Sequence, residues 1–419
     1  MMGLKIGLVT GEYPPMEGGV GAFTQEIAKA LATLGHEIHI ITSNQARPPK
    51  SRTRPEQGSF SETFKWLDNL SEPHDLGYAK LHPRGRRWRW SEVTLIADIV
   101  QRYELDVVNV QYQAAAYNMR SAAINLLPWR LRGLAKTVIT YHDLRVPYLF
   151  PKAGQYREKA VYFMGQQADG AIVTNQSDFD VLTQHIDSPV RNIPIGSNIS
   201  NYAPNQVELD EVRESLGLKN DDYLLGYFGF LNESKGADTL IKAVAELDKR
   251  HHLVFIGGRT GASDHRNNKL FFDNLDHLIR AFGLEKRVHW TGFVSDVRVS
   301  SHLHAADLVV MPYKDGVSLR RGTLMAALAH GRPVISTEPT QPIPELTHGE
   351  NIWLVPPDDS KELTQQVKKL LKDQSLRERL GHGACTVAQQ FTWDKIAQQT
   401  AAFFEELMPN GSAKENGRS

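Results

Sequence analysis

Short apolar runs alternate with amphipathic stretches along almost the whole chain, and this alternation limits the possible fold more than any other feature. It is typical of repeated strand–helix–strand units, which build parallel sheets. Most of the apolar runs are continuous Val/Ile segments, as expected of strands that helices cover on both faces. The predicted fold class is therefore α/β, with two Rossmann-like doubly wound domains. The pattern predicts strands over 5–10, 37–42, 106–111, 136–141, 170–174, 191–195, 223–229, 253–257, 288–293, 308–312, 333–336 and 352–355. It predicts helices over 20–34, 91–105, 156–167, 178–186, 236–247, 270–282, 322–330 and 361–371.

A polar segment with Pro204 and several asparagines separates the two series of elements, which suggests a domain boundary near residue 198. We expect an N-terminal domain over 1–198 and a C-terminal domain over 199–391. The tail over 409–419 is polar, and we expect it to be disordered. Ligands of open α/β sheets bind beyond the carboxyl ends of the strands, so two such domains facing each other would form a central cleft.

Composition excludes several classes of protein. Lys and Arg number 48 against 48 Asp and Glu, a balance that argues against a dedicated nucleic-acid binder. The single cysteine, Cys385, excludes an intramolecular disulfide framework and a cysteine-based zinc cluster. No apolar run is long enough to span a membrane, and the N-terminus lacks a secretory pattern. These features predict a soluble cytoplasmic enzyme.

A glycine-rich loop follows the first predicted strand and precedes the first predicted helix. Gly18, Gly19 and Gly21 allow the backbone to approach a ligand, and the helix start offers N–H groups to an anion. The spacing fits neither the dinucleotide fingerprint nor the nucleoside-triphosphate loop. The loop therefore predicts an anion or sugar near the first turn, although a tight turn without a ligand fits the pattern equally well.

The run Arg84-Gly-Arg-Arg-Trp-Arg-Trp90 combines basic and aromatic residues. One interpretation is contact with anionic lipid headgroups or with a phosphorylated acceptor. The other is a solvated loop and helix start whose tryptophans pack locally.

Several motifs follow one another along the chain. Glu12-Tyr-Pro-Pro15 is followed by Gly18-Gly-Val-Gly21, and Gly229-Phe-Leu-Asn-Glu-Ser-Lys-Gly236 opens the second half. Later landmarks are 288–293, 305–312, 330–334 and 354–357. In this order the motifs resemble family-4 retaining glycosyltransferases of the two-domain GT-B fold, and the segment over 229–236 is similar to that family's phosphate-binding turn. The resemblance implies an acceptor-binding N-terminal domain and a nucleotide-sugar-binding C-terminal domain. It also implies a last helix, over 392–408, that returns to the N-terminal domain.

Basic residues of the second half are candidates for holding a diphosphate. An ammonium at Lys235 and two guanidiniums at Arg320 and Arg321, next to helix starts, suit a departing diphosphate. In the family an arginine usually stands five residues before this lysine, but here that position is Phe230. The family's usual pair of glutamates is also missing, which suggests a variant branch. Depending on the register, those positions fall at Ser318 and Ala326 or at Asp315 and Thr323.

The predicted site residues follow from these arguments and from the resemblance. His142, at the end of a predicted strand, is similar to the family's histidine that hydrogen-bonds the transferred sugar. Asn109 and Gln111 suit recognition of acceptor hydroxyls, although packing at the edge of the core explains them equally well. We predict three groups: catalytic His142, Lys235 and Arg321; donor-binding Gly19, Gly21, Lys235, Ser318, Arg320, Arg321, Gly322 and Thr323; and acceptor-binding Glu12, Asn109, Gln111 and Asp143.

The predicted function is transfer of a hexose from a nucleoside-diphosphate sugar to a glycan, lipid or small-molecule hydroxyl, with retention at the anomeric carbon. The resemblance implies no cofactor and no metal, with peripheral contact to the inner membrane face as an option. Three alternatives stay open: a nucleotide-sugar epimerase or hydrolase, a pyridoxal-phosphate-dependent glycan phosphorylase, and a non-catalytic sugar-nucleotide-binding protein.

Overall fold

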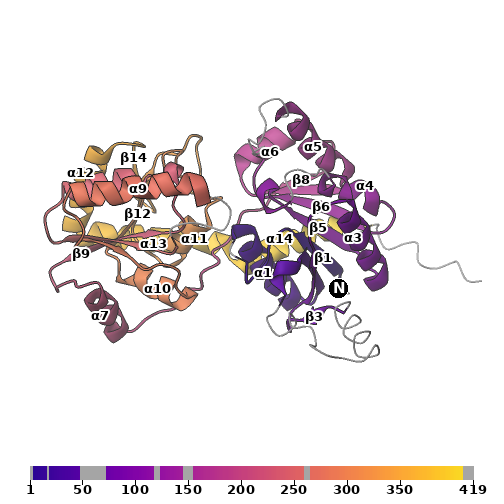
Figure 1. Ribbon diagram of the computed structural model, residues 1–419, viewed down its shortest axis with the longest axis horizontal. Coiled ribbons are helices and arrows are strands. Elements are labelled where there is room, and N and C mark those ends of the chain that lie inside the picture. The colour runs from indigo at the N-terminus through magenta and orange to yellow at the C-terminus, as the bar shows by residue number, and fades with distance from the viewer. Residues whose placement is uncertain are drawn as a thin grey trace, which may run out of the picture. The chain divides into compact units, whose positions relative to one another are not determined.

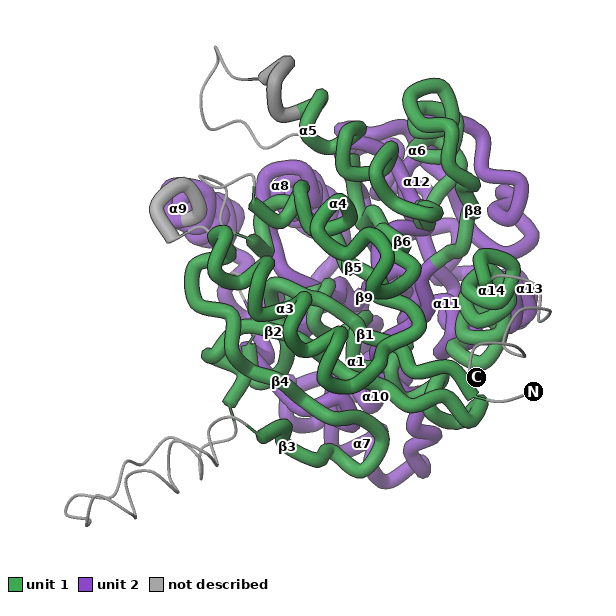
Figure 2. Tube along the Cα trace, turned by 90° about the vertical axis from the view of Figure 1, so that its right-hand side faces the viewer, with its two compact units in different colours: residues 1–194, 393–419 green, residues 195–392 purple. Residues whose placement is uncertain are grey.

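The computed structural model describes residues 3–16, 18–47, 72–117, 123–144, 154–258 and 265–408. Its packing divides the chain into two compact units. Unit 1 comprises residues 1–194 and 393–419, and unit 2 comprises residues 195–392 (Figure 2). The predicted tail over 409–419 lies outside the described residues.

Unit 1 is built on an eight-stranded sheet with the order β3-β4-β2-β1-β5-β6-β7-β8. Every neighbouring pair is parallel except β3 with β4, and Leu8 lies opposite both Ile40 and Asn109. The strands are β1 (Lys5–Thr10), β2 (Glu37–Ser43), β3 (His74–Asp75), β4 (Lys80–Gly85), β5 (Val107–Tyr112), β6 (Lys136–Tyr141), β7 (Gly170–Val173) and β8 (Val190–Asn192).

Helices cover both faces of this sheet, because its strands alternate apolar side chains between two buried clusters (Figure 1). One face packs against α1 (Gly19–Thr33) and α14 (Trp393–Glu406), which also contact each other. The other face packs against α3 (Trp90–Tyr103), α4 (Leu127–Leu131), α5 (Gly154–Gln167) and α6 (Gln176–Leu182). The last helix of the described chain thus belongs to unit 1.

Unit 2 is built on a six-stranded sheet with the order β11-β10-β9-β12-β13-β14, in which every pair is parallel. Its strands are β9 (Tyr223–Phe228), β10 (His251–Ile256), β11 (Val288–Trp290), β12 (Leu308–Met311), β13 (Val334–Thr337) and β14 (Trp353–Val355). Its helices are α7 (Gln206–Ser215), α8 (Ala237–Ala245), α9 (His265–Ala281), α10 (Asp296–Ala305), α11 (Gly322–Ala329), α12 (Ser360–Lys372) and α13 (Gln374–Ala388). Two apolar clusters again lie on opposite faces. The predicted α/β class with two parallel sheets is confirmed.

Candidate active site

The turns that follow β9 and β12 lie side by side at the carboxyl edge of the unit 2 sheet. The chain runs outward in opposite directions from these two neighbouring strands, which makes this position the switch point where ligands of such sheets bind. Two glycines bring the turns together. At Gly236, with φ of 69°, an added Cβ would lie 1.8 Å from the carbonyl oxygen of Pro312. At Gly229, with φ of 121°, it would lie 2.6 Å from Cγ2 of Thr323. Neither position accepts a larger residue without displacing the site.

Two predicted cations meet over one aromatic ring in this part of unit 2. Tyr313 is buried two residues after the end of β12, and burial raises the pKa of its hydroxyl. The Lys235 Nζ lies 5.3 Å from the centre of the Tyr313 ring, and the Arg321 guanidinium carbon lies 3.9 Å from it. Both distances are in the range of cation–π contacts. Lys235 and Arg321, 86 positions apart in sequence, therefore belong to one cluster.

The Arg321 side chain is held in place by an ion pair, and one of its N–H donors makes no hydrogen bond to the described residues. Its Nη2 donates a hydrogen bond to Oδ1 of Asp315, and its side chain is 12% exposed. Its Nε is buried and has no hydrogen-bond partner within the described residues. A buried guanidinium N–H without an acceptor costs free energy, and a bound anion would satisfy it.

The start of α11 adds to the positive character of the cluster. Arg321 is its N-cap residue, no side chain caps the helix, and its first turn carries no acidic residue. The hydroxyl of Thr323, in this first turn, lies 3.3 Å from the Tyr313 hydroxyl. The positive end of the helix macrodipole thus coincides with the two cations, an arrangement that favours a phosphate.

The turn before α11 carries the remaining predicted donor-binding residues. Oγ of Ser318 accepts hydrogen bonds of 3.4 Å from the backbone N and from Nε of Arg320. Of the positions that correspond to the family's glutamate pair, Asp315 is bound by Arg321 and Ala326 is buried inside α11. Ser318 and Arg320 thus lie on the turn before α11, and Gly322 and Thr323 are the first two residues of that helix.

A network of charges fixes the same turn from the other side. Nζ of Lys314 lies 3.0 Å from Oδ2 of Asp238, in the first turn of α8, and 3.5 Å from Oδ1 of Asp358. Burial opposes the charge of Lys314, but these carboxylates outweigh it and raise the pKa of the ammonium. The backbone N of Lys314 also donates to the carbonyl of Ser234 at 2.9 Å. These contacts hold the turn after β12 against the turn that carries Lys235.

In unit 1 the carboxyl group of Glu12 binds the backbone N–H groups of the glycine-rich loop. Oε1 of Glu12 accepts hydrogen bonds from the backbone N of Val20 at 3.0 Å and of Gly21 at 3.2 Å. Burial raises the pKa of this carboxyl group, while the two hydrogen bonds partly oppose that shift. The expectation that N–H groups at Gly19 and Gly21 are open to an external anion is thus not met at Gly21, because Glu12 occupies that N–H group.

His142 ends a chain of buried polar side chains at the carboxyl ends of β5 and β6. Its Nε2 lies 2.9 Å from Oε1 of Gln111, and the Gln111 amide donates to Oδ1 of Asn109. The amide of Asn109 donates to Oγ1 of Thr140 at 2.9 Å and to the carbonyl of Val138. Burial lowers the pKa of His142 to about 4, so its imidazole is neutral at pH 7.

The prediction that Asn109 and Gln111 bind acceptor hydroxyls needs correction. Both side chains are buried and their amide groups are engaged inside the protein. Their hydrogen bonds instead fix the orientation of His142, in keeping with the packing alternative. Asp143 is less buried than these two residues, and its Oδ2 accepts a hydrogen bond of 3.1 Å from Gln113.

Tyr313, Asp315 and Gln113 were not among the predicted site residues. A signal for Tyr313 existed, because it follows a predicted strand and precedes the Arg320–Arg321 pair by a few positions. The pairing of Asp315 with Arg321 depends on the path of the turn, which residue spacing does not reveal.

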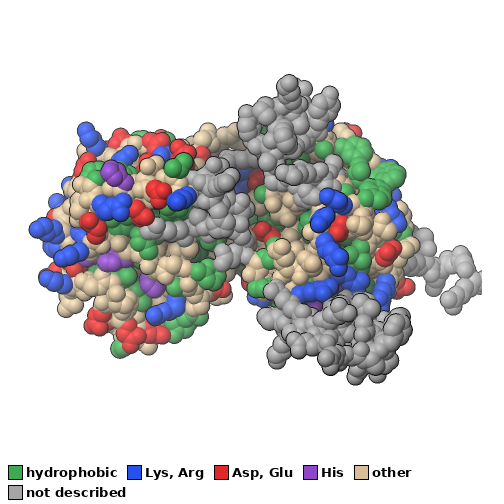
Figure 3. Space-filling view, viewed as in Figure 1, with side chains coloured by type: hydrophobic (Ala, Val, Ile, Leu, Met, Phe, Trp, Pro, Cys, Tyr) green, Lys and Arg blue, Asp and Glu red, His purple; other side chains and the backbone are tan. Residues whose placement is uncertain are grey.

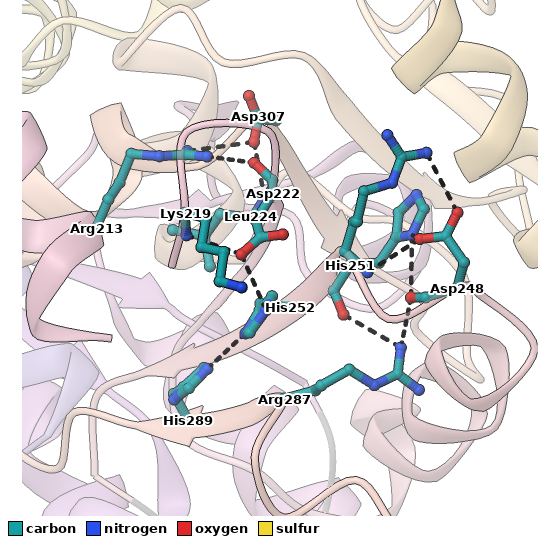
Figure 4. Close-up of polar contacts among 11 residues, drawn as sticks. Arg213, Lys219, Asp222, Leu224, Asp248, His251, His252, Arg287, His289 and Asp307 are labelled. Carbon is teal, nitrogen blue, oxygen red and sulfur yellow. Dashed lines mark hydrogen bonds and ion pairs between the residues drawn. The ribbon is translucent and has the colours of Figure 1, made fainter. Parts of the chain in front are cut away.

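A second polar cluster, at the opposite edge of the unit 2 sheet, has a structural explanation (Figure 4). Arg213 donates to the carboxylate of Asp307 and to the carbonyl of Asp222, and Nδ1 of His252 lies 3.0 Å from Nε2 of His289. These contacts join α7 to the amino ends of the strands, whereas the Tyr313 cluster lies at their carboxyl ends. They explain the stability of this edge rather than a binding function.

Within the residues that the structure describes, no three His, Cys, Asp or Glu side chains are grouped as metal ligands. None of the helices over these ranges combines the length and apolar character that crossing a bilayer requires.

Comparisons with known proteins match both halves of the chain. The family model for glycosyltransferase family 4 matches residues 17–200, and the model for glycosyl transferases group 1 matches residues 209–386. D-inositol 3-phosphate glycosyltransferase of Corynebacterium aurimucosum is 24% identical, over 97% of this chain and 96% of its own. N-acetyl-alpha-D-glucosaminyl L-malate synthase of Bacillus anthracis is also 24% identical, over 97% of this chain and 98% of its own.

Solved structures of similar fold cover nearly the whole chain. Sucrose-phosphate synthase of Thermosynechococcus elongatus superposes with a TM-score of 0.71 at 20% identity, over 96% of this chain and 99% of its own. Anabaena HepE in complex with UDP gives a TM-score of 0.71 at 20% identity, over 96% of this chain and 100% of its own. Both comparisons agree with the two-sheet architecture described above.

Proposed function

Since the chain is a glycosyltransferase of the two-domain GT-B class, we propose that it transfers a hexose from a nucleoside-diphosphate sugar to an acceptor hydroxyl. The proposal includes retention of configuration at the anomeric carbon and no requirement for a metal or cofactor. Two relatives are named for D-inositol 3-phosphate and L-malate, which supports a small hydroxyl compound as acceptor, while a glycan or a lipid-linked sugar is the alternative.

One observation carries the proposal: Lys235 and Arg321 lie over the same Tyr313 ring beside the uncapped start of α11. A diphosphate leaving group gains negative charge as the bond to the sugar breaks. Fixed cations and a helix start that stabilise this charge more strongly in the transition state than in the ground state lower the barrier. The unpartnered Nε of Arg321 is a donor of the kind that this charge requires.

The proposed reaction passes through a sugar with oxocarbenium character paired with the departing diphosphate. A leaving phosphate oxygen accepts the proton of the attacking hydroxyl, so no protein carboxylate is needed as nucleophile or base. His142 is assigned to a hydrogen bond with a hydroxyl of the transferred sugar. Its Nε2–H donates to Gln111, which leaves the lone pair of Nδ1 to accept that hydrogen bond. Asp143 is assigned to the acceptor.

The test is a thermal-shift panel of nucleoside diphosphates and their sugars, beginning with UDP and UDP-glucose because HepE binds them. A ligand at 100 times its dissociation constant adds about 2.7 kcal/mol to apparent stability, which gives a clear melting shift. Lys235→Ala should lose the shift, and Lys286→Ala, an exposed lysine of the same unit, should keep it.

Products then separate transfer from its alternatives. Incubation of the stabilising donor with candidate acceptors should give a new glycoside whose anomeric proton coupling matches that of the donor. Free sugar or an epimerised donor as the only product would contradict transfer. Failure of every nucleoside diphosphate to bind the wild-type protein would overturn the donor site itself.

A further inference from the structure

The turn between β4 and α3 has a strained backbone that its surroundings hold in place. Trp88 has φ of 48°, in the left-handed region that bulky residues rarely adopt. Its ring is buried, lies close to Gly85 and contacts the Tyr117 ring at 4.9 Å with an edge-on geometry. The Tyr117 hydroxyl in turn donates to the carbonyls of Val9 and Gln111. The turn is therefore fastened to the centre of the unit 1 sheet, and such strain points to a functional segment.

A single carboxylate organises the backbone of the same turn. Oε1 of Glu92 accepts hydrogen bonds from the backbone N of Arg86 and Arg87, and Oε2 accepts one of 2.8 Å from the backbone N of Arg89. Burial opposes the charge of Glu92, but these hydrogen bonds outweigh it and lower the pKa of the carboxyl group. The backbone thus folds inward around Glu92, while the side chains of Arg86, Arg87 and Arg89 are exposed.

Two solvent-exposed tryptophans lie next to these arginines. Trp90, the first residue of α3, is 47% exposed, and Trp129 of α4 is 50% exposed. Their ring centres are 6.4 Å apart, and Arg130 follows directly in α4. Basic side chains lie beside a hydrophobic patch on the face of unit 1 that carries α3 and α4 (Figure 3). Two adjacent half-exposed tryptophans expose apolar area that folding leaves uncovered.

We propose that the surface formed by Arg86, Arg87, Arg89, Trp90 and Trp129 docks on the headgroup layer of an anionic lipid bilayer. Tryptophan prefers this layer because its ring is apolar while its N–H is polar. Arginines beside it are attracted by the negative surface potential of the lipid. The chain has a net charge of zero, so the attraction comes from this surface rather than from the whole protein. A soluble phosphate would use the arginines but would leave the two tryptophans without a role.

The surface also lies at the carboxyl edge of the unit 1 sheet, which is the edge that carries His142. Gly85 ends β4, which is parallel to β2 and therefore shares its carboxyl edge with the strand that precedes His142. A bilayer at this surface would lie near the edge at which we expect the acceptor. The proposal does not depend on the donor site, because all of its residues belong to unit 1.

Vesicle flotation of the full chain tests the proposal. Vesicles of phosphatidylcholine with about 30% phosphatidylglycerol should carry the protein upward, pure phosphatidylcholine should not, and binding should fall as sodium chloride rises. Because each basic residue near such a surface contributes about a fivefold change in partition coefficient, Arg86→Gln with Arg87→Gln should reduce binding roughly 30-fold. Trp90→Ala with Trp129→Ala should also reduce it at least fivefold.

Matched variants in unit 2 control for charge and hydrophobicity. Arg280→Gln with Arg298→Gln removes the same charge from exposed positions, and Leu270→Ala removes an exposed apolar side chain; both should bind as the wild type does. Donor-induced melting shifts, measured on every variant, report folding and the donor site separately. No binding to anionic vesicles would overturn the proposal. So would binding that survives the tryptophan variants but is competed by inorganic phosphate, since that result identifies a soluble anion site.

Discussion

The two units place helix starts at the carboxyl edges of similar parallel sheets, but they treat the positive ends of those helices in opposite ways. In unit 1 the start of α1 is filled by the carboxylate of Glu12, which accepts from Val20 and Gly21. In unit 2 the start of α11 has no capping side chain and no acidic residue in its first turn, and the cations Lys235 and Arg321 lie beside it.

This difference gives the two sheet edges different electrostatic properties. A helix start that its own carboxylate satisfies has little electrostatic attraction left for an anion. The unit 1 edge instead presents a neutral imidazole, His142, oriented by buried amides, which suits a sugar hydroxyl. The unit 2 edge keeps its positive charge for an anionic ligand. This contrast supports the proposal that the diphosphate binds at the unit 2 edge and that sugar hydroxyls meet the neutral unit 1 edge.

The largest effect that tests this contrast is expected from Arg321→Ala. Losing charge-assisted hydrogen bonds to a diphosphate costs about 1.5–3 kcal/mol for each bond, so donor affinity and turnover should fall roughly 100-fold. Arg321→Lys should restore little, because an ammonium cannot reproduce the planar fork held by Asp315. Calorimetric titration with UDP measures the affinity, and Arg298→Ala is the exposed control. Unchanged affinity would show that the cluster is structural.

A smaller effect is expected at the neutral edge of unit 1. His142→Ala should lower turnover about 10–100-fold through the loss of one hydrogen bond that strengthens in the transition state, with UDP affinity unchanged. Gln111→Leu should lower turnover several-fold, because the imidazole loses the partner that orients it. Steady-state kinetics separates the two roles of Gln111. A raised KM for the acceptor with an unchanged kcat would mean that Gln111 contacts the acceptor after all.

The two units differ at their sheet edges, but acid should lower the stability of both. Burial lowers the pKa of His82 to about 3 and that of His304 to about 4, while an unfolded histidine titrates near 6.5. As pH falls below about 6.5 the unfolded chain binds protons that the folded chain does not. The free energy of unfolding should then fall by up to about 1.4 kcal/mol per pH unit for each such histidine, and the loss ends below the folded pKa.

Urea unfolding at pH 7.5, 6 and 5 measures this slope. His82→Gln, which removes one titrating group from unit 1, should make the slope shallower without changing donor affinity. A free energy of unfolding that is constant between pH 7.5 and 5 would contradict the burial of these histidines.

Much of the fold follows from local sequence, since β1 and β6 begin and end where their Val/Ile runs predict. β4 was missed because its sequence, KLHPRG, contains Pro83 and charged residues that do not resemble a buried strand. The helices α7, α10 and α13 were missed as well. Their apolar faces are interrupted by polar residues, and packing within unit 2, such as that of α7 against α10, is what stabilises them.

Some features of the candidate site could likewise be predicted from local sequence, while others depend on tertiary contacts. Lys235 and Thr323 were predictable as neighbours because they follow the carboxyl ends of β9 and β12, which lie in one parallel sheet. The role of Asn109 was not, because its partner Thr140 is 31 residues away and only the register of β5 with β6 brings them together. Likewise, the distance from Glu12 to Gly21 in sequence does not reveal which anion fills the helix start.

Glu12→Gln makes the smallest and most selective change in the contrast between the two helix starts. Glutamine keeps a hydrogen-bond acceptor for Val20 and Gly21 but removes a negative charge that burial disfavours, so the free energy of unfolding should change by no more than about 0.5 kcal/mol. Glu208→Gln, in the capping box of α7, is the matched control for removing a carboxylate from a helix start. UDP affinity should not change in either variant, because the diphosphate is assigned to unit 2. If Glu12→Gln instead tightened UDP binding several-fold, the carboxylate would have been repelling a phosphate at α1. Gly19 and Gly21 would then return to the donor site, and the two helix starts would share one function.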